Sequence, residues 1–304
     1  MAGSPNERSG TIIGMDGFTV AEVPALRSPV VIMAFTGWSD TGTVTTDTAK
    51  RLIEAYGAER FLTVDPEDYY VFTETRPTVR LDSDGQRTVN WPENEVYFAR
   101  LPDAEHDLVI VVGEEPNLRW RTFSERLGEA IAATQPSLIC TLVARPAATP
   151  HTRPIPVTGS AADPVLAAKY GLGRSMYQGP TGILGVLHDV LRRRGLGLIS
   201  LSASIPHYLN VEENPAATMA LLHALEPVLG VAPPIGDLEA EGVRFIDRVE
   251  EASRGDDQIG AYVRTLEEHF GEPEEEGDGE DTDLPSADDI LRDVEDFLRG
   301  SNDS

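Results

Sequence analysis

The features that the sequence lacks exclude several classes of protein. A single cysteine, Cys140, excludes a disulfide framework. Lysine and arginine total only 25 against 51 aspartate and glutamate residues, so the 304-residue chain carries a net charge of −26. Such an acidic surface repels phosphates, and we expect no nucleic-acid partner. No run approaches the roughly 18 apolar residues of a membrane span and no secretion signal is recognised, so we expect no membrane association and a cytoplasmic location.

Motifs for catalysis and metal binding are also missing. The chain holds no G-x-S-x-G, H-E-x-x-H or C-x-x-C pattern. Its six histidines form no metal-ligand spacing with one another or with the cysteine. We therefore predict no metal and no cofactor, and we assign no catalytic residue.

The pattern that is present predicts an α/β fold. Apolar runs typical of buried strands alternate with amphipathic helical patterns along most of the chain. The strand-like runs are 29–35, 61–64, 108–112, 138–143 and 198–201, and the helical patterns are 40–56, 117–133, 180–194 and a segment from 214 in which Pro227 is expected to cause a kink or an early end. This alternation predicts a three-layer α/β/α sandwich around a mainly parallel sheet.

Two segments depart from the alternation. Within 69–101, Asp84-Gly85 is a turn signal between 78–81 and 87–91, which predicts an antiparallel hairpin that extends the edge of the sheet. After residue 230, amphipathic patterns at 238–249 and 259–270 predict a helical hairpin. We therefore divide the body into an α/β domain at 1–230 and a helical-hairpin appendage at 231–270.

The segment 271–304 is unusually acidic, with 14 acidic residues against two arginines. Residues 271–284 hold too little apolar surface to offset the entropy of ordering, which predicts a disordered acidic linker. Residues 285–300 show the pattern of an amphipathic helix. Its apolar stripe consists of Ile290, Leu291, Val294, Phe297 and Leu298. A helix this short is marginal alone, so it should dock, and either its own body or a partner protein remains open as the docking surface.

A glycine-rich turn between the first strand and the first helix is the main candidate for a ligand cleft. Its candidate residues are Gly37, Trp38, Asp40 and Gly42. The outer glycines have the spacing of a phosphate loop, but Thr43-Val44 replaces the Lys-Ser/Thr pair that such a loop requires. Two interpretations remain: a tight turn with Asp40 as helix N-cap, or a pocket wall at the carboxyl edge of the sheet.

Three further residues belong to the same candidate cleft. Glu114 and Glu115 follow the strand at 108–112. With Asp40 they form either an acidic cluster that binds a cation or acts as a general base, or a set of solvated loop acids. Thr181 precedes a helix whose glycines either admit an anion at the helix start or allow close packing. His207 lies just past the last strand, where it either faces the cleft or serves as a structural histidine.

Several segments taken together resemble the PAC2 family, the proteasome-assembly-chaperone-2-like proteins, and especially its long actinobacterial branch. They are 35–42 (FTGWSDTG), Arg76-Pro77 with Asp84-Gly85, 179–184 (GPTGIL), 199–201 (ISL), 205–208 (IPHY) and 214–218 (NPAAT). The resemblance implies a phosphorylase/hydrolase-like α/β/α sandwich that self-associates into small rings, with a homotrimer as the expected form. Some relatives dock into proteasome pockets through a hydrophobic-Tyr motif at the C-terminus, which the final residues here, SNDS, do not match.

Two functions remain open from the sequence. The first is a non-enzymatic, homo-oligomeric assembly chaperone or adaptor that acts through protein surfaces, with a proteasome-related partner. The alternative is an enzyme or small-molecule binder that uses a cleft at the carboxyl edge of the sheet.

Overall fold

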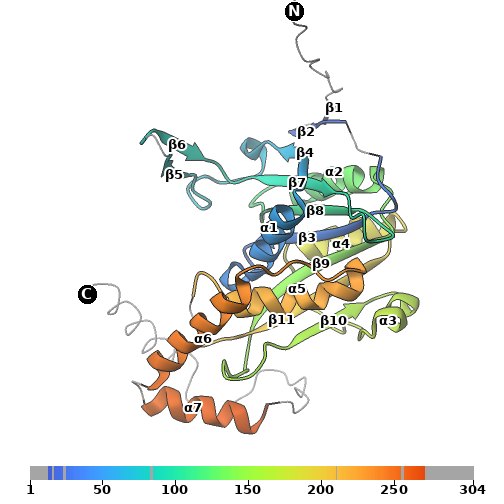
Figure 1. Ribbon diagram of the computed structural model, residues 1–304. Helices are drawn as coiled ribbons and strands as arrows, with labels where there is room; N and C mark the ends of the chain where they lie inside the picture. Colours follow the sequence, from blue (N-terminus) through green and yellow to red (C-terminus); the bar gives the residue numbers. More distant parts are fainter. Residues whose placement is uncertain are drawn as a thin grey trace, which may run out of the picture.

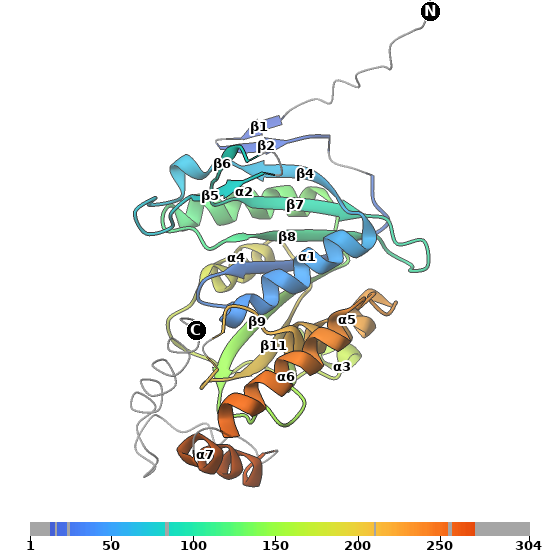
Figure 2. The same ribbon diagram turned by 60° about the vertical axis from the view of Figure 1, so that its left-hand side comes forward.

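The computed structural model describes residues 13–15, 17–22, 25–82, 85–209, 211–254 and 257–270. Within them, a nine-stranded sheet lies between two layers of helices (Figure 1, Figure 2). The predicted linker at 271–284 and the predicted helix at 285–300 lie outside the described residues. No helix in the described part of the chain is long and apolar enough to cross a membrane.

The centre of the sheet is parallel and both flanks are antiparallel. The strand order is β1-β2-β4-β7-β8-β3-β9-β11-β10. Parallel pairing joins β8 (Leu108–Glu114), β3 (Val30–Thr36), β9 (Leu138–Ala147) and β11 (Leu198–Pro206). Antiparallel strands add β1 (Ile13–Met15), β2 (Phe18–Val20), β4 (Glu59–Val64) and β7 (Asn94–Ala99) on one side, and β10 (Val157–Ala161) on the other.

Four helices complete the sandwich. The helices α1 (Val44–Tyr56) and α5 (Pro215–Leu229) cover one face, and α2 (Trp120–Ala133) and α4 (Ile183–Arg193) cover the other (Figure 1). Because successive side chains of a strand point to opposite faces, β3 contributes to two cores. Ile32 belongs to the core under α1 and α5, whereas Met33 belongs to the core under α2 and α4. The predicted three-layer α/β/α fold is therefore confirmed.

Several boundaries differ from the sequence prediction. A short 3-10 turn, η1 (Thr41–Thr43), precedes α1, so the helix begins at Val44 and not at Asp40. The helix α5 continues through Pro227 to Leu229, because Val228 and Leu229 are buried in the core and only the last turn loses a hydrogen bond. The sequence analysis missed two short helices, η2 (Pro66–Asp68) and α3 (Pro164–Tyr170), and the strands β1, β2 and β10.

The predicted β-hairpin forms at the expected residues, but it does not join the main sheet. The strands β5 (Thr78–Leu81) and β6 (Arg87–Asn90) pair in antiparallel register. They make a separate two-stranded sheet, and Figure 1 shows it projecting away from the main sheet. The prediction that this hairpin extends the sheet edge is therefore wrong, because β1, β2, β4 and β7 supply that edge.

The predicted helical hairpin is α6 (Leu238–Arg254) followed by α7 (Asp257–Glu268). The helix α6 packs against α5 and buries Leu238 and Phe245. Figures 1 and 2 both place α7 at the end of the molecule opposite the β5–β6 hairpin.

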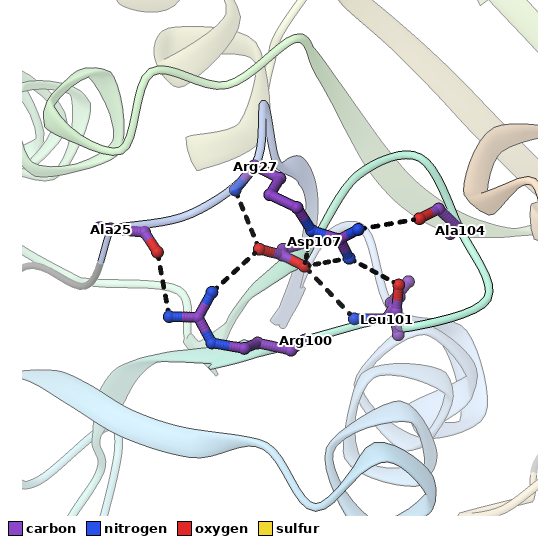
Figure 3. Close-up of polar contacts among 6 residues, drawn as sticks. All are labelled: Ala25, Arg27, Arg100, Leu101, Ala104 and Asp107. Atoms are coloured by element: carbon purple, nitrogen blue, oxygen red, sulfur yellow. Dashed lines mark hydrogen bonds and ion pairs between the residues drawn. The ribbon is translucent and has the colours of Figure 1, made fainter.

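A buried carboxylate fixes the amino end of β8 (Figure 3). Asp107 is fully buried, and Arg27 binds it through Nη2 at 2.7 Å and through its backbone N–H at 2.9 Å. Arg100 approaches the other side of the carboxylate at 3.4 Å, and the Leu101 N–H also points at it. Burial opposes ionisation of Asp107, but the hydrogen bonds from Arg27 outweigh it and hold the pKa below its usual value.

Candidate functional site

The candidate cleft residues lie near the carboxyl ends of the parallel strands. Because β3, β8, β9 and β11 run in the same direction, the loops that follow them meet at one edge of the sheet. This edge therefore brings together segments that are more than 100 residues apart in the sequence, and the contacts made there define what each candidate residue does.

Asp40 caps the start of the first helix. Its carboxylate accepts hydrogen bonds from the Thr45 N–H and from the Thr46 hydroxyl, both at 2.6 Å. Burial raises the pKa of Asp40, and these hydrogen bonds oppose the rise. The tight-turn interpretation, with Asp40 capping the first helix, is therefore the one that the contacts favour.

The turn between Asp40 and α1 holds two consecutive residues in the left-handed region. Gly42 has φ 62° and Thr43 has φ 48°. The left-handed conformation is rare for a β-branched residue, so Thr43 stores local strain. Its hydroxyl donates to Glu212 O at 2.9 Å and lies 2.8 Å from the Asp47 carboxylate. The bond to Glu212 fastens the turn to the loop after β11.

Glu115 occupies the helix start at which anion binding was one of the two predicted alternatives. Its Oε1 accepts from the Ile183 N–H at 2.6 Å, at the first residue of α4, and its Oε2 accepts from the Trp38 N–H at 3.3 Å. A carboxylate at a helix N-terminus is stabilised by the helix dipole and by otherwise unpaired N–H groups. The anion at this helix start is therefore supplied by the protein itself, and the sequence analysis missed this role of Glu115.

The glycines around α4 make room for two particular side chains. A Cβ on Gly182 would lie 2.8 Å from Oε1 of Glu115, which is too close. A Cβ on Gly185 would collide with the Thr181 hydroxyl. The glycines therefore permit close packing, as one interpretation predicted, but against a carboxylate and a hydroxyl and not against the sheet.

Glu114 faces a neighbouring cavity of about 280 Å³ between α1 and the strands β7 and β8. Its carboxylate accepts a hydrogen bond from the Thr36 hydroxyl. The cavity wall also includes Lys50, Trp91 and Tyr97. Glu114 and Asp40 thus belong to different hydrogen-bond networks, and no bond between them supports the predicted acidic cluster.

Two ionisable side chains in the wall of this cavity have raised pKa values. Burial, and then the nearby charge of Glu95, raises the pKa of Glu93. Burial and the hydrogen bond to Glu95 raise the pKa of Tyr97 to about 12. Arg60 also pairs with Glu95. Within the described residues, no group of three or more His, Cys, Asp or Glu side chains is placed to hold a metal ion.

His207 joins the sandwich to the helical hairpin. Its Nδ1 lies 3.0 Å from Ala147 O, and its Nε2 lies 3.0 Å from the Tyr262 hydroxyl on α7. A carbonyl oxygen only accepts, so Nδ1 carries the proton and Nε2 accepts from Tyr262. The structural interpretation of His207 is favoured over the cleft interpretation.

Exposed apolar side chains lie at the same edge as the satisfied polar groups. Trp38 is 67% exposed, Tyr177 is 67% exposed and Met176 is 63% exposed. Both rings flank one short segment: Gly182 packs beside Trp38, and the Tyr177 hydroxyl donates to Pro180 O at 2.7 Å. Large exposed apolar side chains near one another are typical of protein-binding surfaces.

These features define a class of protein: an α/β/α sandwich whose carboxyl-edge polar groups, as far as the described residues show, serve structural contacts. The PAC2 family model matches residues 34–253, and the chain belongs to the PAC2 family.

Solved structures of similar proteins agree with this assignment. A PAC2 family protein from Streptomyces avermitilis is 38% identical, with 77% of this chain and 99% of that chain covered and a TM-score of 0.71. A proteasome-assembly chaperone homologue from Mycobacterium tuberculosis is 36% identical, with the same coverage and a TM-score of 0.69. A Pyrococcus furiosus archaeal proteasome activator, 20% identical over 77% of this chain and 97% of that chain, shares the fold with a TM-score of 0.63. No curated protein matches the chain.

Proposed function

We propose that this protein is a non-enzymatic assembly chaperone or adaptor that acts through its surfaces, as a homotrimer in the cytoplasm, with proteasome subunits as its partner. It belongs in this proposal to the long actinobacterial branch of the family. One observation carries the proposal: at the carboxyl edge, the polar groups expected to do chemistry are engaged in structural bonds, and apolar rings are left exposed. Asp40 caps α1, Glu115 caps α4 and His207 holds α7.

The exposed rings support the choice of a protein partner. Trp38 and Tyr177 present large, rigid and partly apolar surfaces, which are the side chains enriched in the centres of protein interfaces. The 36% identical relative from Mycobacterium tuberculosis is a proteasome-assembly chaperone homologue, and this similarity supports proteasome subunits as that partner.

A crosslinked capture from native lysate tests this function. The full chain should retain proteasome subunits in stoichiometric amounts, identified by mass spectrometry, and a chain ending at residue 270 tests whether the acidic tail contributes. Recovery of self-copies alone from both chains would contradict the adaptor function.

A second candidate function is small-molecule binding in the cavity beside Glu114. Its volume of about 280 Å³ is close to the lower limit of ligand pockets, and its wall combines acids with Trp91 and Tyr97. This wall suits a small organic cation. A thermal-shift screen of alkylamines separates the two functions: saturable stabilisation that Glu114→Gln abolishes would favour the cavity, and no shift would remove this candidate.

A further inference from the structure

We propose that the β5–β6 hairpin is an arm that binds a second copy of this chain. The arm comprises residues 76–91, whose strands form a two-stranded sheet apart from the main sheet. Every residue of β5 and β6 is exposed. A two-stranded sheet alone in water is marginally stable, so the arm needs a surface to pack against. This inference rests on the proposed homo-oligomer.

The arm has one apolar face and one polar face. Val79 pairs with Val89 and Leu81 pairs with Arg87, and paired residues of antiparallel strands share a face. Trp91 follows Val89 at the next position of the same alternation and contacts the Phe72 ring at 4.8 Å between centroids. The opposite face carries Thr78, Arg80, Thr88 and Asn90.

Within the described residues, the apolar face is largely uncovered apart from the contact of Trp91 with Phe72. The side chains of Val79, Leu81 and Val89 are 50%, 67% and 52% exposed, and Trp91 is 45% exposed. A contiguous apolar strip of this kind on a projecting element is typical of an interaction surface. No residue of β5 or β6 belongs to the hydrophobic cores of the sandwich.

Charge complementarity selects a second copy as the occupant. The arm holds Arg76, Arg80 and Arg87 against Asp82 and Asp84, a net charge of +1 in a chain of net charge −26. Without the arm, residues 1–270 still carry a net charge of −15. Another copy therefore presents an acidic surface to a basic, apolar arm. Opposite potentials of this kind steer association and fix its orientation.

The helix α6 offers a stripe that fits the arm. Glu239, Val243 and Asp247 recur at intervals of four residues, so they share one helix face, and all three are exposed. Val243 is 58% exposed, which places an apolar side chain between two carboxylates. The apolar side chains of the arm match Val243, and Arg87 at the end of the same arm face matches one of the two carboxylates.

The positions of the two surfaces favour a contact between copies. The arm and α6 lie on either side of α1 in both views (Figure 1, Figure 2). One chain therefore does not cover its own arm with α6. A contact between unlike surfaces of neighbouring copies is heterologous and closes into a ring when the rotation fits.

Sedimentation of the full chain tests the arm. The wild-type chain should sediment as a closed oligomer of the 33.0 kDa chain. The double variant Val79→Ser/Val89→Ser should sediment as a monomer, because it removes the central pair of the apolar face. The matched control Thr78→Ser/Asn90→Ser alters the neighbouring pair on the polar face and should keep the wild-type mass. A monomeric wild-type chain, or an oligomer that persists in the apolar-face variant, would contradict the proposal that the arm binds a second copy.

A charge exchange tests the receiving surface and excludes simple misfolding. Arg87→Glu and Asp247→Arg should each raise the dissociation constant by about tenfold or more, and the two together should restore association. No restoration would overturn the assignment to α6. These mass measurements use this protein alone. If the oligomer forms without the arm, the arm proposal fails, but the proposed adaptor function is still tested separately by the partner capture.

Discussion

The Glu115 carboxylate lies 2.6 Å from the Ile183 amide nitrogen, and the same carboxylate also accepts from the Trp38 N–H. One side chain from the β8 loop thus fastens the start of α4 and the turn after β3. The helix N-terminus is thereby closed by an internal anion, and the loop carrying the exposed Trp38 ring is held in place. Glu115 is a positioning residue for the surface that we propose to bind protein.

Substitution Glu115→Ala should therefore lower stability and loosen both loops. Loss of a helix-capping acceptor typically costs about 1–2 kcal/mol, so we expect a change of this size in the free energy of unfolding. Hydrogen exchange at Ile183 should accelerate. The control Glu114→Ala removes the adjacent carboxylate, which bonds to Thr36, and should leave exchange at Ile183 unchanged. Equal acceleration in both variants would contradict the role of Glu115.

The buried Asp107 should dominate the response to acid. Its folded pKa is held below the unfolded value of about 3.9. Ionised Asp107 therefore contributes stability above roughly pH 4, and this contribution is lost as the pH falls through the folded pKa. The variant Asp107→Asn should lose about 2–3 kcal/mol at neutral pH, less than for a fully buried pair because Arg27 and Arg100 are half exposed.

Urea unfolding at several pH values measures this effect. The wild-type chain should lose stability more steeply below roughly pH 4 than Asp107→Asn. The control Asp189→Asn removes an exposed carboxylate that pairs with Arg192 and Arg193, and it should change stability by less than about 0.5 kcal/mol. Parallel acid profiles of Asp107→Asn and the wild-type chain would contradict the assignment.

The His207–Tyr262 bond should control the attachment of α7. The variant Tyr262→Phe keeps the ring and removes the hydroxyl that His207 accepts from. One lost hydrogen bond typically costs about 1 kcal/mol, so exchange along α7 should accelerate by roughly fivefold while the sandwich stays protected. The control Tyr170→Phe on α3 should leave α7 unchanged. Uniform acceleration throughout the chain would show that α7 and the sandwich unfold as one unit.

The sequence predicted the parts of the fold that repeat a clear pattern. Continuous apolar runs identified the parallel strands, because strands covered on both faces have no polar positions. The end of α1 followed from Gly57, which adopts the left-handed conformation at the helix end. The hairpin turn was also predicted, but its separation from the sheet was not, since local pairing does not determine which edge a hairpin joins.

The candidate site was predictable only in part. The cap at Asp40 follows from local sequence, because the residues that it bonds to lie five and six positions away. The bond between Glu115 and Ile183 spans 68 residues, and the bond between His207 and Tyr262 spans 55. Contacts at such separations arise from the order of strands in the sheet, which no local pattern encodes.

The most direct test of the adaptor function is quantitative capture with a variant of the exposed edge. The variant Trp38→Ser/Tyr177→Ser removes two exposed rings and should leave the melting temperature nearly unchanged. The control Val165→Ser alters a side chain that is 75% exposed on α3. We predict that proteasome subunits bind the wild-type chain and the control in stoichiometric amounts and are lost from the edge variant. Equal recovery from all three chains, or no stoichiometric partner from any of them, would contradict the adaptor function.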